Sequence, residues 1–408
     1  MPPHDDPGTP LRIAFVTQAF AKGFGYIENA MPRHFARQGH EVQLITLDLS
    51  PYLAKGPQPR GAVVRQSELP PGLVEKYDGY TLNVLGHRDV LGYPRPQGLL
   101  EKLRAFRPHI VQTGTAIGWI PLQAAVASPF IGYKLFTGSH TNASQFPLAD
   151  PNVKHPFGTR AKAFATRWIP GRFVSLFTQR CWTQTNDSRL IASRFFGVQK
   201  RKVETMHLGV ETDQFHPART PEEIAERERT RHELGVAPTD IMAIYTGKLS
   251  SVKNVRVLAD AVTEIRKSRG LPYKAVFIGE GDQRQSIEAY DACRVLSAIP
   301  HAELARYYRA ADIGVWPTSE SVSTHDAAAC GLPLICGDLM TDREHVDGNG
   351  LVVKSYDVPD LVRALLELGD PATRARLGAN GAEKMLAHFS WAAMASRRLV
   401  AYRAALAS

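Results

Sequence analysis

Short, continuous apolar runs alternate along this chain with longer segments in which apolar residues recur every three or four positions. The first run covers residues 11–17, and after a glycine-bearing loop an amphipathic segment extends to Gln38. Gly39 and His40 end this predicted helix, and residues 41–47 form a second apolar run. Such runs are typical of strands buried on both faces of a parallel sheet, so we expect a βαβ unit here.

The same alternation continues to the end of the chain. Further strands are predicted at 109–112, 133–137, 181–185, 203–207, 241–245, 274–278, 294–296, 313–316 and 332–336. A charged helix at 221–234, shortly after Pro217, marks a second start of the pattern. Alternating strands and helices predict doubly wound α/β sheets, and two such starts predict two Rossmann-like domains that face a central cleft.

Length and composition agree with this class. A chain of 408 residues suits two domains, and 44% hydrophobic with 22% charged residues is typical of a globular protein. The net charge of +9 permits nucleic acid, an anionic membrane or a polyphosphate as partner without choosing among them. The four cysteines lack metal-ligand spacing, and no signal peptide or membrane span is apparent. We therefore expect a cytoplasmic protein, with peripheral contact at the inner face of the membrane left open.

The segment that follows the predicted strand at 313–316 carries the clearest chemical signal. A loop of small polar residues contains Glu320, and a short Ala-rich helix has Asp326 in its first turn and ends at Gly331. A strand, such a loop and a free helix N-terminus form an anion site, because unpaired N–H groups and the helix dipole point at the ligand. Acidic side chains beside it suit sugar hydroxyls, so the segment predicts a nucleotide-sugar diphosphate ligand.

This segment resembles the donor-binding motif of retaining glycosyltransferases of family 4, which have the GT-B fold. In that family, two glutamates separated by seven residues bracket a Phe-Gly loop. Here Asp326 stands at the position of the second glutamate, Glu320 lies only six positions before it, and Val322-Ser323 replaces Phe-Gly. The resemblance implies that Glu320 holds the hydroxyls of the donor sugar and Asp326 the ribose. The loop residues assigned with them to donor binding are Ser321, Val322, Ser323 and Thr324.

A second loop with suitable charge follows the predicted strand at 241–245. Lys248 and Lys253 lie five positions apart after Gly247, where they can straddle a diphosphate and neutralise a departing nucleotide. The family shows an arginine and a lysine here, and Lys253 matches that lysine. Lys248 stands in place of the arginine, so the positive charge is kept but the two parallel hydrogen bonds of a guanidinium are lost. A solvated basic loop is the alternative interpretation. We assign all three residues to donor binding.

Three weaker signals complete the donor side. Gly279 and Glu280 resemble a family loop in which glycines let the backbone approach the nucleotide, although an ordinary tight turn fits equally well. The resemblance implies that Ile299 borders the base through backbone groups. Gly25 belongs to a glycine-rich N-terminal loop that resembles one near the donor phosphates, and Glu28 follows it in a helical first turn, where it complements the dipole.

His140 follows the predicted strand at 133–137 and resembles a family histidine that faces the cleft near the donor sugar. There it could hydrogen-bond a sugar hydroxyl or steer the acceptor, whereas the plainer alternative is a satisfied histidine at a strand end. Many relatives carry another histidine after the preceding strand, where this chain has residues 111–115 without one. This absence places more of the acceptor-side chemistry on His140.

Residues 151–186 contain no acidic residue and interleave basic with aromatic side chains. Such a composition, in a helical pattern that we expect to break at Pro170-Gly171, suits docking at an anionic membrane through 154–182. A lipid-linked acceptor would lie at such a surface. The alternative is a core-packed helix pair with a solvated basic face. Nucleic acid is not expected, because no recognised nucleic-acid module surrounds these residues.

The second start of the pattern near Pro217 predicts the domain bounds 1–215 and 216–387. The resemblance extends over most of the chain and implies that 388–408 is a helix that crosses back to the first domain. It implies a retaining glycosyltransferase that moves a sugar from a nucleoside-diphosphate sugar to a hydroxyl acceptor, with His140, Lys248, Lys253 and Glu320 as catalytic residues. No metal or other cofactor is expected, because the chain has no Asp-x-Asp pair.

Cell-surface polysaccharide or lipid-linked glycan assembly is the favoured pathway, and glycosylation of a small soluble metabolite is the alternative. A nucleotide-sugar epimerase and a non-catalytic nucleotide-sugar-binding protein on the same fold also remain open.

Overall fold

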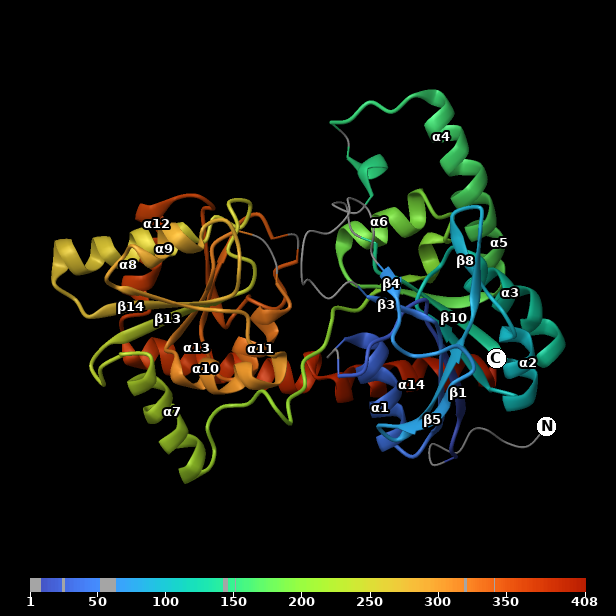
Figure 1. Cartoon of the computed structure of the whole chain (residues 1–408), viewed down its shortest axis with the longest axis horizontal. Coiled ribbons are helices and arrows are strands. Elements are labelled where there is room, and N and C mark those ends of the chain that lie inside the picture. The colour runs from blue at the N-terminus through green and yellow to red at the C-terminus, as the bar shows by residue number, and fades with distance from the viewer. Residues whose placement is uncertain are drawn as a thin grey trace. The chain divides into compact units, whose positions relative to one another are not determined.

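The computed structural model describes residues 9–23, 26–51, 64–141, 146–150, 152–318, 321–340 and 342–408. The chain divides into two compact units, Met1–Leu208 with Met394–Ser408 (unit 1) and Gly209–Ala393 (unit 2) (Figure 1). The divisions therefore fall at 208/209 and 393/394, and the sequence-based domain bounds at 215/216 and 387/388 stay predictions.

Unit 1 is built on an eight-stranded sheet in the order β12-β11-β10-β9-β1-β2-β6-β5. All neighbouring strands are parallel except β5 and β6, which pair antiparallel. The strands are β1 Arg12–Val16, β2 Glu41–Leu47, β5 Val74–Tyr77, β6 Tyr80–Leu85, β9 Ile110–Thr113, β10 Lys134–Ser139, β11 Thr178–Thr183 and β12 Val203–Thr205. Two short antiparallel pairs accompany the sheet, β3 Leu49–Pro51 with β4 Val64–Gln66 and β7 His87–Val90 with β8 Tyr93–Pro96.

Helices cover this sheet, and the last one comes from the end of the chain. They are α1 Ile27–Arg37, α2 Leu99–Phe106, α3 Trp119–Ile131, α4 Phe157–Ala163, the π-helical turn η3 Phe164–Trp168, α5 Ile169–Phe177, α6 Asn186–Arg194 and α14 Trp391–Ala407. The Tyr402 ring on α14 is buried, with its centroid 4.7 Å from that of Phe136 and 5.6 Å from that of Trp182. Residues from the C-terminus thus belong to the aromatic core of unit 1.

Unit 2 has one parallel six-stranded sheet in the order β15-β14-β13-β16-β17-β18. The strands are β13 Ile241–Thr246, β14 Tyr273–Ile278, β15 Cys293–Leu296, β16 Ile313–Trp316, β17 Leu334–Gly337 and β18 Gly350–Val353. Its helices are α7 Pro221–Glu233, α8 Arg256–Arg269, α9 Arg284–Glu288, the 3-10 turn η5 His301–Glu303, α10 Leu304–Ala310, α11 Ser323–Ala329, α12 Val358–Glu367, α13 Pro371–Lys384 and the π-helical turn η6 Met385–Phe389. The strand order reverses between β13 and β16, and ligands of such sheets bind at the carboxyl ends of the strands at this switch point.

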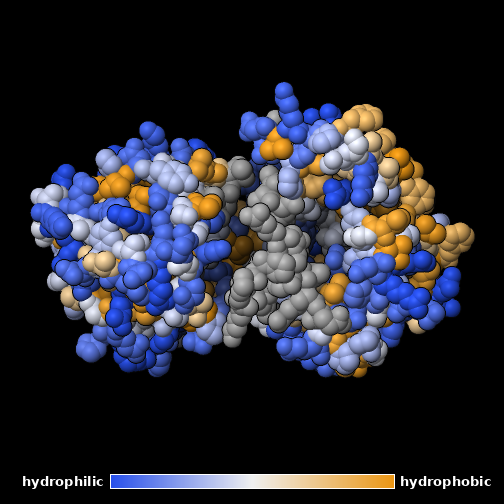
Figure 2. All heavy atoms as spheres, turned by 45° about the horizontal axis from the view of Figure 1, so that its top comes forward, coloured by the Kyte–Doolittle hydropathy of each residue, from blue (hydrophilic) through white to orange (hydrophobic). Residues whose placement is uncertain are grey.

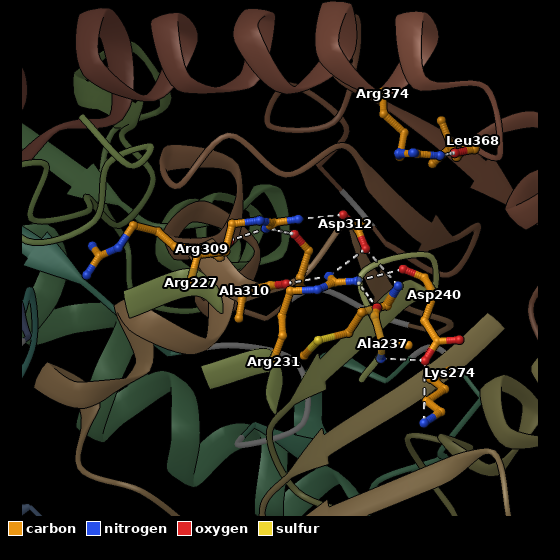
Figure 3. Close-up of polar contacts among 12 residues, drawn as sticks. Arg227, Arg231, Ala237, Asp240, Lys274, Arg309, Ala310, Asp312, Leu368 and Arg374 are labelled. Atoms are coloured by element: carbon orange, nitrogen blue, oxygen red, sulfur yellow. Dashed lines mark hydrogen bonds and ion pairs between the residues drawn. The ribbon is translucent and has the colours of Figure 1, made fainter. Parts of the chain in front are cut away.

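The opposite, amino-terminal edge of this sheet is closed by a charged cluster. The guanidinium of Arg231 on α7 is buried and donates to Asp312 Oδ2 at 2.9 Å and to the carbonyl of Asp240 at 2.6 Å (Figure 3). Arg227, one helical turn earlier, donates to Asp312 Oδ1 at 2.8 Å. These bonds tie α7 to the loops that enter β13 and β16, so the arginines have a structural role.

One expectation for unit 1 is wrong. The helical pattern does not break at Pro170-Gly171, since α5 runs through both residues. Pro170 lies just after the π-helical turn η3, and the helix continues through it without a break. A Cβ at Gly171 would lie 2.0 Å from the carbonyl oxygen of Phe196, so glycine is required there for close packing, not as a helix breaker.

Two further observations bear on the sequence-based expectations. None of the four cysteines forms a disulfide bond, and three of them are buried. Among the described residues, no helix is both long enough and apolar enough to cross a membrane.

Candidate functional site

Two loops at the carboxyl edge of the unit 2 sheet, one after β13 and one after β14, pack directly on each other. The Leu249 N–H donates to the Glu280 carbonyl at 2.9 Å. A Cβ at Gly279 would lie 1.9 Å from the carbonyl oxygen of Gly247, and a Cβ at Gly281 2.0 Å from that of Leu249. Gly279, which the sequence assigned to nucleotide approach, and Gly281 therefore both allow one loop to pack closely against the other.

The lysine loop also reaches across the switch point. The backbone carbonyl of Lys253 accepts a hydrogen bond from Thr318 Oγ1 at 3.2 Å, and its N–H donates to the Ser250 carbonyl at 3.0 Å. Thr318 follows β16, the strand that leads into the predicted donor loop. Lys253 is half-buried and Lys248 is exposed. The structure thus places both lysines at the edge that carries the donor loop.

Asp326, in the first turn of α11, is buried and paired with a histidine. Its Oδ2 lies 2.9 Å from Nε2 of His301 on η5. Burial raises the pKa of Asp326, although the hydrogen bond and charge of His301 oppose this. Burial alone would lower the pKa of His301, but the hydrogen bond and charge of Asp326, with Glu211, outweigh it and leave the pKa raised. His301 therefore stabilises the charged form of the Asp326 carboxylate, which is almost completely buried.

The sequence did not assign His301 to the site. It stands two residues after Ile299, in a stretch that was assigned only backbone contacts to the base. Ile299 itself is half-buried and packs against the core of unit 2. The sequence shows a histidine in the turn η5, directly before α10. Its partner Asp326 becomes apparent only in the folded structure, where η5 and α11 lie together.

A buried polar cluster fixes the start of α11 to the end of β13. Tyr308 Oη lies 2.6 Å from Thr246 Oγ1, and Tyr308 also hydrogen-bonds Ser323. Burial and then the charge of Asp326 raise the pKa of Tyr308 well above its usual value. Trp316 adds a bond from its indole N–H to the Thr246 carbonyl at 3.1 Å. These contacts position α11, and with it Asp326.

The sequence predicted unpaired N–H groups at the start of α11, but two of these groups are hydrogen-bonded. The Thr324 N–H donates to the Ser321 carbonyl at 3.1 Å, and the Ser323 N–H to Ser321 Oγ at 3.4 Å. The helix has only seven residues, so its dipole is short. The start of α11 is therefore a weaker candidate for anion binding than the sequence predicted.

Two predicted site residues, Gly25 and Glu320, lie outside the described residues. Glu280 is described and forms an ion pair with Arg284 at 3.1 Å, and a hydrogen bond from Ser297, followed by Arg284, lowers its pKa. Val322 is the N-cap residue of α11 and is exposed. In the described part of the chain, no group of three or more His, Cys, Asp or Glu side chains could hold a metal ion.

His140 lies at the carboxyl edge of the unit 1 sheet, just after β10. Its Nδ1 is 2.9 Å from Nε2 of Gln184, and because the amide nitrogen donates, the imidazole proton resides on Nε2. Burial, and then the charge of Arg398, lower the pKa of His140 to about 4. At neutral pH this imidazole is a hydrogen-bond donor and a poor base.

A carboxyl and a phenol belong to the same cluster of unit 1. Burial raises the pKa of Glu28 to about 7, although its own backbone N–H and Arg398 oppose the shift. Burial, then the charge of Glu28, raise the pKa of Tyr26 to about 12, and a hydrogen bond to Gln184 opposes this. The buried Arg398 of α14 has its guanidinium carbon 4.6 Å from the centroid of the Trp182 ring.

Comparison with known families agrees with the geometry of both units. The family profile described as "Glycosyl transferases group 1" matches residues 240–370, and the profile "Glycosyltransferase Family 4" matches residues 30–214. The first match lies within unit 2 and the second almost wholly within unit 1, and together they cover about three quarters of the chain. The chain belongs to family 4 of the glycosyltransferases, also described as group 1.

Among curated proteins, the chain is 26% identical to the D-inositol 3-phosphate glycosyltransferase of Rhodococcus erythropolis over 310 residues, 71% of this chain and 65% of that protein. The first curated relatives are matched over only 49% to 65% of their own length.

Solved structures share the fold at low sequence identity. A glycosyltransferase from Rickettsia africae aligns over 98% of this chain and 99% of its own, with a TM-score of 0.66 and 12% identity. Anabaena HepE in complex with UDP aligns over 97% and 100%, with a TM-score of 0.66 and 12% identity. The fold of this chain is GT-B, with two Rossmann-like domains.

Proposed function

We propose that this protein transfers a sugar from a nucleoside-diphosphate sugar to a hydroxyl acceptor. The observation that carries the proposal is the bond between Lys253 and Thr318, which brings the lysine loop to the switch point beside the donor loop. Parallel sheets of this type bind nucleotides at that edge. The fold-sharing HepE structure from Anabaena is in complex with UDP, which supports a nucleoside diphosphate as the ligand class.

The proposed chemistry keeps the anomeric configuration of the sugar. The bond from the anomeric carbon to the diphosphate breaks while the acceptor oxygen bonds to the same face, and the acceptor proton passes to the departing phosphate. Lys248 and Lys253 neutralise the charge that develops on the diphosphate. Glu320 holds the donor hydroxyls and Asp326 lies toward the ribose. The reaction in this proposal needs no metal ion.

On the acceptor side, His140 acts as a hydrogen-bond donor. With a pKa of about 4 it is neutral at physiological pH, so it does not remove the acceptor proton. Its Nε2–H orients a hydroxyl of the donor or acceptor, and this role agrees with proton transfer to the leaving phosphate.

Two acceptor classes are supported by different observations. The curated relatives are named for D-inositol 3-phosphate, which favours a small phosphorylated polyol. The basic and aromatic segment at 154–182 favours a lipid-linked acceptor in polysaccharide or lipid-linked glycan assembly. We keep the lipid-linked acceptor as the first candidate and the small metabolite as the second.

The test is release of nucleoside diphosphate from a panel of nucleotide sugars, with and without each acceptor class and with and without EDTA. We expect acceptor-dependent release that EDTA leaves unchanged, and an NMR coupling constant of the product that shows the donor's anomeric configuration. Conversion of the donor without acceptor would instead indicate an epimerase. Binding without turnover across all acceptors would indicate a non-catalytic protein.

A further inference from the structure

An apolar row runs along the outer side of the helical arm formed by α4, η3 and α5. We define this apolar row as Phe157, Phe164, Ile169, Phe173 and Leu176. Their exposed fractions are 87%, 50%, 50%, 39% and 59%. A core-packed helix pair would bury such side chains, so the structure does not support that alternative for this arm. Figure 2 shows hydrophobic atoms gathered on this side of unit 1, toward the upper right of the view.

The π-helical turn keeps the row on one face. In an α-helix, residues four apart share a face, whereas residues five apart diverge. Here the Ile169 N–H donates to the Phe164 carbonyl, a bond between residues five apart. Phe164 and Ile169 therefore lie one above the other on the same face of the helix. Phe173, four residues after Ile169, and Leu176, three residues further, continue the row. Such π-turns occur frequently at functional sites.

The other side of the arm is anchored to unit 1. A Cβ at Gly171 would lie 2.0 Å from the Phe196 carbonyl oxygen, and one at Gly197 2.3 Å from the Trp168 carbonyl oxygen. Val174 is buried in the core beside α3, the helix that packs against α5. Helix α3 adds the exposed side chains of Val126 and Phe130, at 48% and 83%. Packing thus fixes the outward direction of the part of the row that lies on α5, namely Ile169, Phe173 and Leu176.

The charge around the row is predominantly positive. No acidic residue occurs between Asp150 and Asp187, and Lys154, Arg160, Lys162 and Arg172 are exposed. Next to the row lies an open cavity of about 690 Å³, lined by Lys154, Arg160 and Arg194 with one acid, Asp150, and by the stacked rings of Phe164 and Trp168. Cations beside apolar side chains match an anionic lipid surface, with phosphate at the head groups and acyl chains beneath.

We propose that the apolar row, with its flanking cations, docks this protein on an anionic lipid bilayer. The aromatic side chains enter the boundary between head groups and acyl chains, and the lysine and arginine side chains contact lipid phosphates. The inference stands independently of the proposed transfer chemistry, since it uses none of the donor-site residues.

The test is co-sedimentation of the full chain with vesicles of phosphatidylcholine, with and without phosphatidylglycerol, at low and high salt. We expect binding to the anionic vesicles, and a partition coefficient roughly tenfold lower on neutral vesicles or at high salt. Phe157→Ser with Phe173→Ser should lower it by about tenfold. The matched control is Ile224→Ser with Leu271→Ser in unit 2, where side chains 52% and 40% exposed are changed in the same way, with no expected effect.

Because the substituted side chains are exposed, all variants should keep the native circular dichroism and melting temperature. No binding to anionic vesicles, equal binding to neutral ones, or full binding by the phenylalanine variant would overturn the proposal. A dimer in light scattering that the phenylalanine variant dissociates, without vesicle binding by the native chain, would also overturn it in favour of a second copy as the occupant.

Discussion

At the residue scale, the pairing of His301 with Asp326 is the contact most directly connected with the donor side. The sequence predicted a donor-side role for Asp326, because its place in the first turn of an Ala-rich helix is visible in the sequence; that role stays a prediction. The sequence did not identify His301 as its partner, since twenty-five residues separate the two. Two residues that come into contact only in the folded structure cannot be recognised as a pair from the local sequence pattern.

We predict that His301→Ala lowers the free energy of unfolding by about 1–3 kcal/mol, because a buried carboxylate loses its hydrogen-bond donor. Chemical denaturation followed by circular dichroism measures this change. In the double variant His301→Ala with Asp326→Asn, much of the loss should be recovered, since no buried charge remains. Equal stability of the native chain and the His301→Ala variant would contradict the assigned pairing.

Glu28 gives a pH-dependent prediction in unit 1. Its pKa is raised to about 7 by burial, so the folded state favours the protonated form. The stabilisation is present below the unfolded pKa of about 4.5 and is lost as the pH rises through about 7. Glu28→Gln keeps a neutral side chain, and it should therefore gain stability relative to the native chain between these pH values, by about 1–3 kcal/mol.

Denaturation midpoints of both proteins at pH 4.5 and pH 8 test this prediction about Glu28. A stability difference that does not change with pH would show that the Glu28 carboxyl titrates alike in the folded and unfolded chain. The sequence identified Glu28 only as a helix-dipole residue, because its burial, which raises the pKa, and the nearby Arg398, which opposes that shift, become apparent only in the folded chain.

At the element scale, the sequence predicted the parallel strands well. Residues 41–47 form β2, and the strand predicted at 313–316 is β16, each with the predicted bounds. Continuous apolar runs identify such strands because both faces are buried. The sequence analysis did not identify β5 to β8. Strands β5, β7 and β8 are short and partly exposed, whereas β6 is mostly buried and pairs parallel with β2. Asp78-Gly79 between β5 and β6 is a recognised hairpin signal, and both residues have positive φ.

The packing of the two loops at the donor edge predicts a strong effect of one methyl group. Gly279→Ala places a Cβ 1.9 Å from the Gly247 carbonyl oxygen at a φ of +154°, so the loops must separate. We expect a loss of about 2–4 kcal/mol in unfolding free energy and weaker nucleotide binding. Gly270→Ala is the matched control, since φ is +65° there with no atom within 4 Å, and it should cost only about 1 kcal/mol.

Calorimetry and nucleotide titration of both glycine variants measure these effects. Equal losses for Gly279→Ala and Gly270→Ala would show that backbone conformation alone, and not contact between the loops, determines the need for glycine. The sequence could not make this distinction, because a glycine that approaches a ligand and a glycine that approaches another loop look the same.

At the scale of the whole molecule, the chain returns to its first unit at the end. Tyr402 on α14 lies among Phe35, Phe136 and Trp182, and its hydroxyl donates to Gln112 Oε1 at 3.3 Å. The sequence-based expectation of a returning helix came from the family resemblance. The side chains that hold the helix to unit 1 could not be read from its sequence, which has no marked apolar stripe.

Tyr402→Ala should destabilise unit 1 by about 3–5 kcal/mol, because it leaves a cavity among buried rings. Val400→Ala on the same helix, where the side chain is 70% exposed, should change stability by less than about 0.5 kcal/mol. Scanning calorimetry should show the loss in the unit 1 transition, with nucleotide binding by unit 2 retained. A loss confined to the unit 2 transition would contradict the placement of α14.

The central claim is that the edge of unit 2 with Lys248 and Lys253 binds a nucleoside diphosphate. The most direct measurement is thermal stabilisation against a panel of nucleoside diphosphates and nucleotide sugars, for the native chain, Lys253→Ala, and Lys267→Ala on α8 as a control with an equal change in charge. A ligand at 100 times its Kd stabilises the native state by about 2.7 kcal/mol. We predict a rise in melting temperature with one nucleoside diphosphate in the native and Lys267→Ala proteins, and its loss in Lys253→Ala. No rise with any nucleotide, or an undiminished rise in Lys253→Ala, would contradict the claim.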